Sequence, residues 1–149
     1  MAFQSYRHRQ SAPIYWILLS LSLLVFLGGL FLGAVLFVIL SSLISLLMGT
    51  LAFMFVWLEV AEDGESLSIC FGPIRAFKKR VRYDSIVDVV RDRSLLIEGW
   101  GVHLGPRGWI WNLWGRQVVE LQFEQGRLRI GTDDPEGLLA HVKERSALS

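Results

Sequence analysis

The sequence predicts a two-helix membrane hairpin followed by a small antiparallel β domain that ends in a helix. Three observations indicate this fold class. The chain has 149 residues, 52% of them hydrophobic, and a mean hydropathy of +0.43, which is unusually apolar for a soluble domain of this size. All 14 acidic residues lie from Glu59 onward, and no residue from Gln10 to Leu58 is charged. Beyond Glu59 the continuous apolar run gives way to the alternation that is typical of strands.

The uncharged segment is long enough for two membrane-spanning helices. One crossing of a bilayer takes about 20 apolar residues, so a single helix would leave more than half of the segment unused. We expect helices at residues 14–34 and 38–58, joined by a tight turn, so that residues 14–58 form a hairpin. No ionisable residue lies within either helix. Because proton relays, ion paths and transporters normally need such residues inside the membrane, the sequence argues against transport.

Aromatic and basic residues beside the hairpin predict its orientation. Trp16 lies at the start of the first helix and Trp57 at the end of the second, where indole rings anchor helices at a membrane interface. Arg7 and Arg9 belong to an N-terminal tail, residues 1–13, and positive residues favour the cytoplasm. We therefore expect both termini in the cytoplasm. A cleaved signal peptide is the competing interpretation, but its apolar run would be only about 7–15 residues long.

Small residues recur at helix-packing spacing in both expected helices. The candidates are Gly29, Gly33, Ser41, Ser45 and Gly49. Such residues let two helix backbones approach closely, so that dispersion and weak hydrogen bonds hold the helices together. We expect the two helices of the hairpin to pack against each other through these positions. Dimerisation through the same faces is the alternative.

The β domain is expected over residues 59–149. The stretch "LEVAEDGESLSICF" indicates two strands around a two-residue turn at Asp63-Gly64, which would pair Val60 with Leu67. Further β-branched or alternating runs indicate more strands, for a total of about seven. These runs are "RAFKKRVRY", "SIVDVVRD", "GWIWNLW", "RQVVELQF" and "RLRI".

The acidic stretch "TDDPE" at residues 132–136 has two interpretations. Pro135 is favoured at the first position of a helix, which makes Asp134 the N-cap residue, and the neighbouring carboxylates suit the positive end of the helix dipole. An acid/base site would need a partner base, a nucleophile or a pocket, and the sequence indicates none of these. We therefore expect a C-terminal helix from about residue 134 to 146, with Asp134 as its cap.

Five motifs of the β domain, taken together with the preceding hairpin, carry a resemblance to a known family. They are "FGP" at 71–73, "RYDSI" at 82–86, "GWGVHLGPRGW" at 99–109, "GRQVVEL" at 115–121 and "GRLRIGTDDPEGLLAHV" at 126–142. In their order and spacing the chain resembles the bacterial PH (pleckstrin-homology-like) domain membrane proteins. The resemblance implies a seven-strand antiparallel β-barrel capped by a helix, a bacterial inner membrane location and a noncatalytic role. Phosphoinositide binding by eukaryotic relatives is not transferred, because fold does not fix function.

Motifs for catalysis or metal binding are not apparent. His8, His103 and His141 are widely separated, and the single Cys70 rules out an internal disulfide framework. The stretch "GWGVHLG" lacks the spacing of a nucleotide-binding loop, and the serines lack the context of a hydrolase nucleophile. We expect no enzymatic activity, no cofactor and no metal.

A basic run is the candidate contact for anionic lipid headgroups. It consists of Arg75, Lys78, Lys79, Arg80 and Arg82, with no carboxylate among them. Alternation puts Lys78, Arg80 and Arg82 on one strand face, and each such charge near an anionic leaflet contributes about 1 kcal/mol. The alternative is a solvated strand face, since residues 59–149 carry 13 basic and 14 acidic side chains. That balance also argues against nucleic-acid binding.

Trp109, Trp111 and Trp114 are candidate interfacial aromatics in the β domain, in addition to Trp16 and Trp57 of the hairpin. An indole ring suits a membrane interface because it is apolar with one wet N–H group. Packing in the protein core is the alternative, and we expect it for at least one of the three.

Together these features predict a noncatalytic inner-membrane protein with a cytoplasmic PH-like binding or scaffolding module. Its ligand would be an anionic lipid headgroup or a protein partner. The alternative is a structural subunit of a membrane assembly that contacts another membrane protein, or a second copy of itself, through the hairpin.

Overall fold

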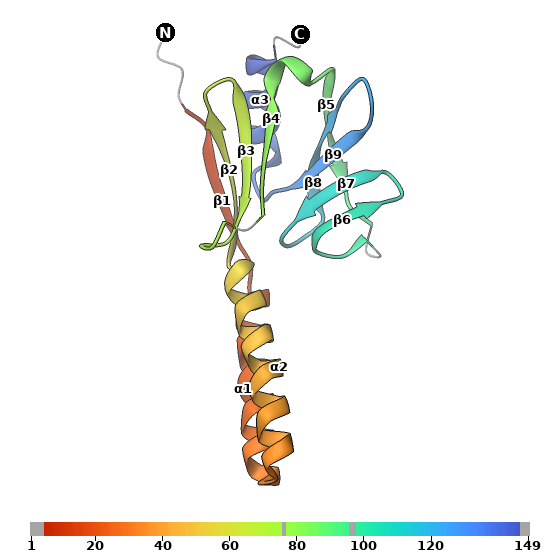
Figure 1. The fold of residues 1–149 in the computed structure, drawn as a ribbon. Coiled ribbons are helices and arrows are strands. Elements are labelled where there is room, and N and C mark those ends of the chain that lie inside the picture. Colours follow the sequence, from red (N-terminus) through yellow and green to blue (C-terminus); the bar gives the residue numbers. More distant parts are fainter. Residues whose placement is uncertain (1–4, 76, 96–97, 147–149) are drawn as a thin grey trace.

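The computed structural model describes residues 5–75, 77–95 and 98–146 of the chain. Figure 1 shows a stem of two long antiparallel helices that carries a domain of two β-sheets and a short helix. The elements are β1 (Arg7–Ser11), α1 (Ile14–Leu32), α2 (Val35–Met54), β2 (Trp57–Asp63), β3 (Ser66–Phe71), β4 (Lys78–Arg82), the 3-10 helix η1 (Tyr83–Ser85), β5 (Asp88–Arg93), β6 (Gly101–Gly105), β7 (Gly108–Asn112), β8 (Gln117–Gln122), β9 (Arg127–Gly131) and α3 (Pro135–Arg145).

Helices α1 and α2 have 19 and 20 residues and are long and apolar enough to span a membrane. Both are shorter than the sequence predicts. Gly33 ends α1 at a φ of +70°, and its N–H donates to the carbonyl of Leu30, so Gly33 caps a helix instead of packing against one. Trp57 was expected to end the second helix, but it is the first residue of β2. Pairing with Ser11 of the N-terminal strand β1 extends β2 back to this residue.

The other small residues pack the hairpin against itself. A Cβ atom at Gly29 would lie 1.8 Å from Oγ of Ser41, so the two helices meet closely there. Ser22 and Ser45 each donate a hydrogen bond of 2.8 Å to the backbone carbonyl of the other. Gly49 lies next to Ser22, since a Cβ atom added to this glycine would be 3.8 Å from the serine Oγ. Gly29, Ser41, Ser45 and Gly49 therefore lie between the two helices.

The hairpin interrupts a β-sheet. Strand β1 pairs antiparallel with β2, with Arg9 opposite Glu59 and Ser11 opposite Trp57. Residues 7–11, which the sequence assigned to a tail, are thus an edge strand of the domain. A strand of five polar residues gives almost no hydrophobic signal, and only its pairing with β2 defines it. Two residues connect β1 to α1 and two connect α2 to β2, so no flexible linker separates the stem from the sheet.

The two sheets are not closed into a barrel. The first has the order β1-β2-β3-β4, and the second has the order β5-β8-β9-β7-β6, with β7 and β9 parallel. The predicted closed barrel of about seven strands is therefore wrong: the described residues form nine strands in two sheets. The ladder stops between β4 and β5, where the 3-10 turn at Tyr83–Ser85 redirects the chain and buries the Tyr83 ring.

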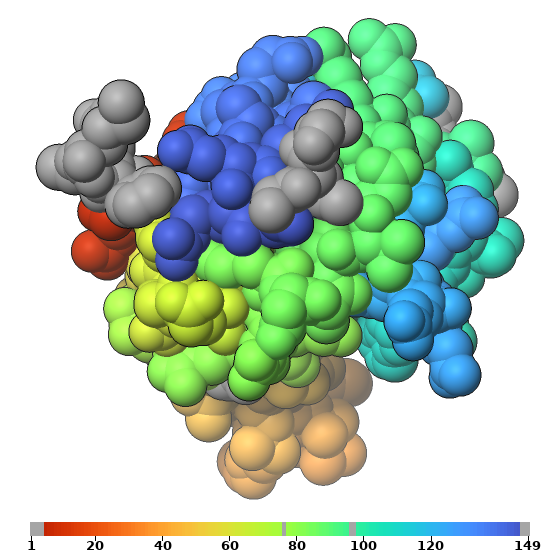
Figure 2. Space-filling view, turned by 90° about the horizontal axis from the view of Figure 1, so that it is seen from above, coloured from red at the N-terminus to blue at the C-terminus, as the bar shows by residue number. Residues whose placement is uncertain are grey.

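The hydrophobic core fills the space between the sheets. It includes Leu67, Ile69, Phe71, Val119, Leu121, Ile130 and Leu138. Helix α3 packs on β5 and β8 through buried Leu138 and Val142. Figure 2 shows α3 (blue) and the β4–β5 connection (green) on the end of the domain that faces away from the hairpin, which lies behind it.

The β2–β3 turn lies one residue later than the sequence predicts. Asp63 pairs with Ser66 and Val60 with Ile69, so Gly64 is the first residue of the two-residue loop. Gly64 has a φ of +63°, and a hairpin turn with glycine in the first central position accepts this angle without strain. Because pairing shifts by two residues, the same side chains still face the core.

A methyl group at Gly72 tests the junction between stem and sheet. Its Cβ would lie 1.9 Å from the carbonyl oxygen of Met54, at a φ of +52°. Gly64→Ala is the matched control, since Gly64 has a similar φ and nothing within 4 Å. We expect left-handed strain of about 1–2 kcal/mol in both variants, and a further penalty of about 1–3 kcal/mol in Gly72→Ala alone.

The measurement is thermal unfolding of the detergent-solubilised full chain, followed by near-ultraviolet circular dichroism. Gly72→Ala should have the lower Tm. Equal shifts in the two variants would mean that the close approach of Gly72 to α2 does not support the fold.

Candidate functional site

A row of side chains crosses the first sheet next to the hairpin. The register places Arg9, Glu59, Cys70 and Lys78 side by side on β1, β2, β3 and β4. Neighbours in such a row point to the same face, which here is the face turned away from the core. Cys70 is buried within the row, and this burial raises the pKa of its thiol. The row thus carries charged groups at both edges of the sheet, with Lys78 two strands, or about 10 Å, from Glu59.

Three guanidinium groups converge on the Glu59 carboxylate. The distances from Nη2 to its oxygens are 2.6 Å for Arg9, 3.0 Å for Arg7 and 3.9 Å for Arg75. The Glu59 side chain is only 7% exposed, whereas the arginine side chains are about half exposed. We call Arg7, Arg9, Glu59, Arg75 and Lys78 the hairpin-proximal cluster. Its four cations and one carboxylate give a net charge of +3.

Glu59 is ionised in this environment. Burial raises the pKa of its carboxyl group, but hydrogen bonds from Arg9 and Arg7 and their charges outweigh burial and hold the pKa below its usual value. Arg9 also lies over the Trp57 ring, with 4.3 Å from its guanidinium carbon to the ring centroid. The carboxylate therefore holds arginines together that would otherwise repel each other, and their outer N–H groups remain exposed.

The β3–β4 turn presents Arg75 beside the end of α2. The Gly72 N–H donates to the Trp57 carbonyl at 2.7 Å, and the Phe77 ring stacks on Phe55 at a centroid distance of 5.9 Å. Arg75 has a φ of +53°, the only positive φ among the described non-glycine residues. Apolar side chains flank it: Ile74 is 51% exposed and Phe77 is 39% exposed. The turn thus combines a cation with two exposed apolar groups.

The structure divides the basic run that the sequence singled out. Lys78 lies at the hairpin end of β4. Arg80 lies one step farther out, level with Arg7 across the sheet, and Arg82 lies farther still. Arg80 pairs with Asp63 at 2.9 Å, and Arg82 pairs with its neighbour Asp84 at 2.5 Å. Four residues of strand separate Lys78 from Arg82 by about 13 Å, which exceeds the screening length of about 10 Å at 0.1 M salt.

Lys79 points to the opposite face of β4 and is half-buried. Of the five predicted headgroup contacts, only Arg75 and Lys78 therefore join the cluster. Sequence analysis missed Arg7 and Arg9 as members, because it placed them in a tail. Their spacing of two residues was the available signal, since it puts both on one face of a strand.

The tryptophans of the domain have different surroundings. Trp111 is 7% exposed and lies 5.8 Å from the Phe71 ring, which confirms that at least one of them packs in the core. Trp114 stacks on Trp100 with a centroid distance of 4.5 Å. Trp109 is 46% exposed, and Trp16 at the start of α1 is 62% exposed. Trp111 is therefore not an interfacial residue.

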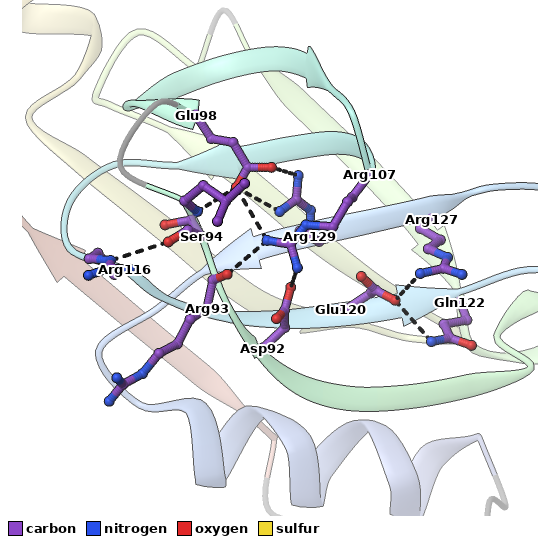
Figure 3. A network of polar contacts seen from close by, with 11 residues as sticks. Asp92, Arg93, Ser94, Glu98, Arg107, Arg116, Glu120, Gln122, Arg127 and Arg129 are labelled. Atoms are coloured by element: carbon purple, nitrogen blue, oxygen red, sulfur yellow. Dashed lines mark hydrogen bonds and ion pairs between the residues drawn. The ribbon is translucent and has the colours of Figure 1, made fainter.

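A second polar network lies within the second sheet. Figure 3 shows Arg129 of β9 directed at Glu98, with distances of 2.5 and 2.9 Å between the two side chains. Both side chains are almost fully buried. Glu98 also accepts the Leu95 N–H, and Arg107 links it to Asp92. The pKa of Glu98 is lowered to about 2, mainly by hydrogen bonds from Arg129. Burial acts in the opposite direction and raises this pKa.

This network is a structural support, because its two guanidinium groups and two carboxylates neutralise one another. It fastens the chain before β6 to the sheet. The sequence offered no signal for it, since Glu98 lies in the apolar context "LLIEGW".

The carboxylates of "TDDPE" act at the start of α3. Oδ1 of Asp134 accepts the Gly137 N–H at 3.0 Å, and Oδ2 accepts the Tyr6 hydroxyl at 3.3 Å. Asp134 thus occupies the N-cap position that the sequence indicates. The nearby His141 shares a hydrogen bond of 2.9 Å with the Tyr83 hydroxyl, and burial lowers its pKa. Both Asp134 oxygens are engaged, so they serve the helix start and its attachment to the segment before β1.

Within residues 5–75, 77–95 and 98–146, no three His, Cys, Asp or Glu side chains are grouped as metal ligands would be. Comparison with known proteins gives no match: no protein-family model, curated protein or solved structure is significantly similar to this chain. The hairpin-proximal cluster is therefore the candidate site on its geometry alone.

Removing the Glu98 carboxylate tests the buried network. Glu98→Gln leaves the Arg129 charge buried without its counterion, which should cost about 3–5 kcal/mol at neutral pH. The pKa of Glu98 falls from 4.5 to about 2 on folding, so its ionised form stabilises the fold above the unfolded value. This stabilisation is lost as the pH falls through the range between these values.

Urea unfolding of the full chain in detergent should therefore show a large difference in the free energy of unfolding between wild type and Glu98→Gln at neutral pH. This difference should become smaller at about pH 3, where more of the Glu98 carboxylate is protonated. Glu136→Gln is the control, because Glu136 forms an exposed ion pair with Arg91 that contributes little. A gap of the same size at both pH values would contradict the assigned charge state of Glu98.

Proposed function

We propose that this chain is a noncatalytic membrane protein whose sheet domain binds anionic lipid headgroups through the hairpin-proximal cluster. In this proposal α1 and α2 span the membrane, and the domain lies at its cytoplasmic face. One observation carries the proposal: the cluster of net charge +3 lies on the first sheet and its β3–β4 turn, and strands β1 and β2 of this sheet continue directly into the two apolar helices. On the motif resemblance we further propose a bacterial inner membrane and a PH-like module whose strands are opened into two sheets.

The position of the cluster supports headgroup binding. A helix of 20 residues is about 30 Å long, which matches the apolar core of a bilayer. Tyr15 and Trp16 then mark the interface at the start of α1. Glu59 and Arg9 lie two strand residues beyond Trp57 and Ser11, about 7 Å farther out. The headgroup region on each side of the apolar core is about 5–8 Å thick, so Glu59 and Arg9 lie at its outer part.

The charge of the cluster sets the scale of the attraction. Each cation close to an anionic leaflet contributes about 1 kcal/mol, so a net charge of +3 corresponds to roughly 3 kcal/mol. Exposed N–H groups of Arg7, Arg9 and Arg75 supply directional hydrogen bonds to phosphate oxygens in addition. An acidic protein partner is the other ligand class for the same surface.

The alternative function, a structural subunit that contacts partners through the hairpin, gains no support from the small residues. Gly29 and Ser41 face each other within the hairpin, and Ser45 is hydrogen-bonded to Ser22. The closest helix approach is therefore used inside the chain. A partner helix would have to pack on the bulky apolar side chains that the hairpin exposes, such as Phe31 and Leu46.

Two double variants separate headgroup binding from bulk charge. Arg75→Gln/Lys78→Gln removes two cations of the cluster, and Arg80→Gln/Arg82→Gln removes two from the far end of the same strand. We expect the first pair to lose most of the preference of the full chain for anionic lipid, up to about 2 kcal/mol. The second pair should retain it, because Arg80 and Arg82 are each paired with a carboxylate of their own, whereas the cluster has four cations and one carboxylate.

The measurement is the association of spin-labelled phosphatidylglycerol, relative to phosphatidylcholine, with the full chain reconstituted in vesicles at low and high salt. Salt should weaken the preference of the wild type, because exposed charges are screened. If both double variants retain the wild-type preference, headgroup binding at the cluster is excluded and the protein-partner alternative becomes the leading one.

The orientation of the hairpin is tested separately in intact cells. In a Cys70→Ala background, cysteines are introduced at Ser5, at Val35 where α2 starts beside the hairpin turn, and at Glu144 in α3. A membrane-impermeant thiol reagent should label only the Val35→Cys variant from outside, since β1 pairs with β2 and holds both ends of the chain on one side. Labelling of Ser5→Cys or Glu144→Cys from outside would reverse the assigned orientation.

A further inference from the structure

The exposed large apolar side chains of the sheet domain gather at its hairpin end. Among the described residues beyond β2 they are Ile74, Phe77, Val87, Leu95, Trp100, Leu104 and Trp109. Of these residues, Val87 lies at the opposite end of the domain. It belongs to the β4–β5 connection, which Figure 2 shows on the end turned away from the hairpin. Ile74 and Phe77 belong to the β3–β4 turn on one side of the stem. Leu104 and Trp109 lie on β6 and β7, and Leu95 and Trp100 lie in the connection between β5 and β6. We call Leu95, Trp100, Leu104 and Trp109 the apolar edge.

The apolar edge follows strand β6. Figure 1 shows β6 as the strand of the second sheet nearest the level at which the helices leave the domain. Leu104 is 66% exposed and pairs across the strands with Trp109, which is 46% exposed. Trp100 precedes β6 and is 50% exposed. Large exposed apolar groups thus lie along and beside β6, the strand of the second sheet at the level where the helices leave the domain.

A groove joins this edge to the lipid-facing surface of the hairpin. Its volume is about 140 Å³, and its lining residues are Ile14, Leu18, Phe55, Trp100, Gly101 and Leu113. Two of these residues belong to the first turns of α1, so one wall of the groove is the surface of an apolar helix. The apolar surface therefore continues without a polar break from α1 to Trp100.

Strand β6 is also an unpaired sheet edge with a suitable charge pattern. It is the last strand in the order of its sheet, and an exposed edge with apolar side chains is normally a risk for association. The segment from Gly99 to Asn112 contains no carboxylate, and Arg107 is its only Lys or Arg residue. A hydrated lipid interface satisfies edge N–H and C=O groups while it takes up apolar side chains.

From these observations we infer that the apolar edge inserts into the lipid interface of the membrane that the hairpin spans. The lipid surface, rather than a second protein, is the partner that fits, because the edge is continuous with the lipid-facing surface of α1 and its indole rings suit an interface. The inference rests on the membrane insertion of the hairpin proposed above, but it does not depend on headgroup binding by the cluster. Contacts on both sides of the stem would fix the tilt of the domain.

Site-directed spin labelling tests this inference. The full chain, in a Cys70→Ala background, is reconstituted in nanodiscs of neutral phosphatidylcholine, so that anionic lipid has no part in the result. Labels are attached to Leu104→Cys and Leu95→Cys on the edge, to Val87→Cys at the far end and to Leu24→Cys in α1. Val87 is the matched control because it is also apolar and 54% exposed. Collisions with oxygen, which concentrates in lipid, are compared with collisions with a water-soluble nickel chelate.

We expect the ratio of oxygen to nickel collisions at Leu104→Cys and Leu95→Cys to exceed that at Val87→Cys about threefold or more, on the scale of an interfacial position. Equal ratios at Leu104→Cys and Val87→Cys, or low collision rates with both reagents at Leu104→Cys, would overturn the inference. The first result means that water covers the edge, and the second means that protein covers it. The Leu24→Cys label must report lipid, since a nickel-accessible label there would instead refute insertion of the hairpin.

Discussion

The pairing of β1 with β2 across the hairpin is the constraint on which the rest of the structure depends. Ser11 lies opposite Trp57, although the whole of both helices separates them in the chain. A linker of flexible residues would let the domain move freely relative to the stem. Here the ladder hydrogen bonds of the first sheet begin within two residues of each helix, so the sheet and the stem are one body at their junction.

This junction explains why the charged groups of the cluster can be held together. Arg7 and Arg9 come from the strand before the hairpin, and Glu59 comes from the strand after it. Repulsion between three guanidinium groups opposes such an arrangement, and the nearly buried Glu59 carboxylate offsets it. Arg75 reaches the same carboxylate from a turn with a left-handed backbone, a conformation that costs of order 1–3 kcal/mol and that the close packing of the turn on α2 maintains.

On the other side of the stem, the buried Glu98–Arg129 pair has a comparable positioning role. It fastens the chain just before Trp100, so that the indole ring lies on Trp114 and borders the groove beside α1. A buried ion pair adds little net stability compared with apolar packing, but it accepts only one arrangement of the chain around it. Both halves of the domain thus place defined surfaces at the hairpin end, one positively charged and one apolar.

The sequence by itself determined those features whose signals are local. The uncharged run defines two helices, because a helix satisfies the backbone polar groups of an apolar segment with its own hydrogen bonds. Asp134 before Pro135 defines a helix start, because both residues act within one turn. Alternation located most strands. Tertiary structure alone decided that Arg7 and Arg9 belong to a strand, that Arg80 pairs with Asp63, that Trp111 is buried and that the sheets do not close. Each of these depends on which distant segment a strand pairs with, and pairing is set by the packing of the whole chain, which no short stretch of sequence encodes.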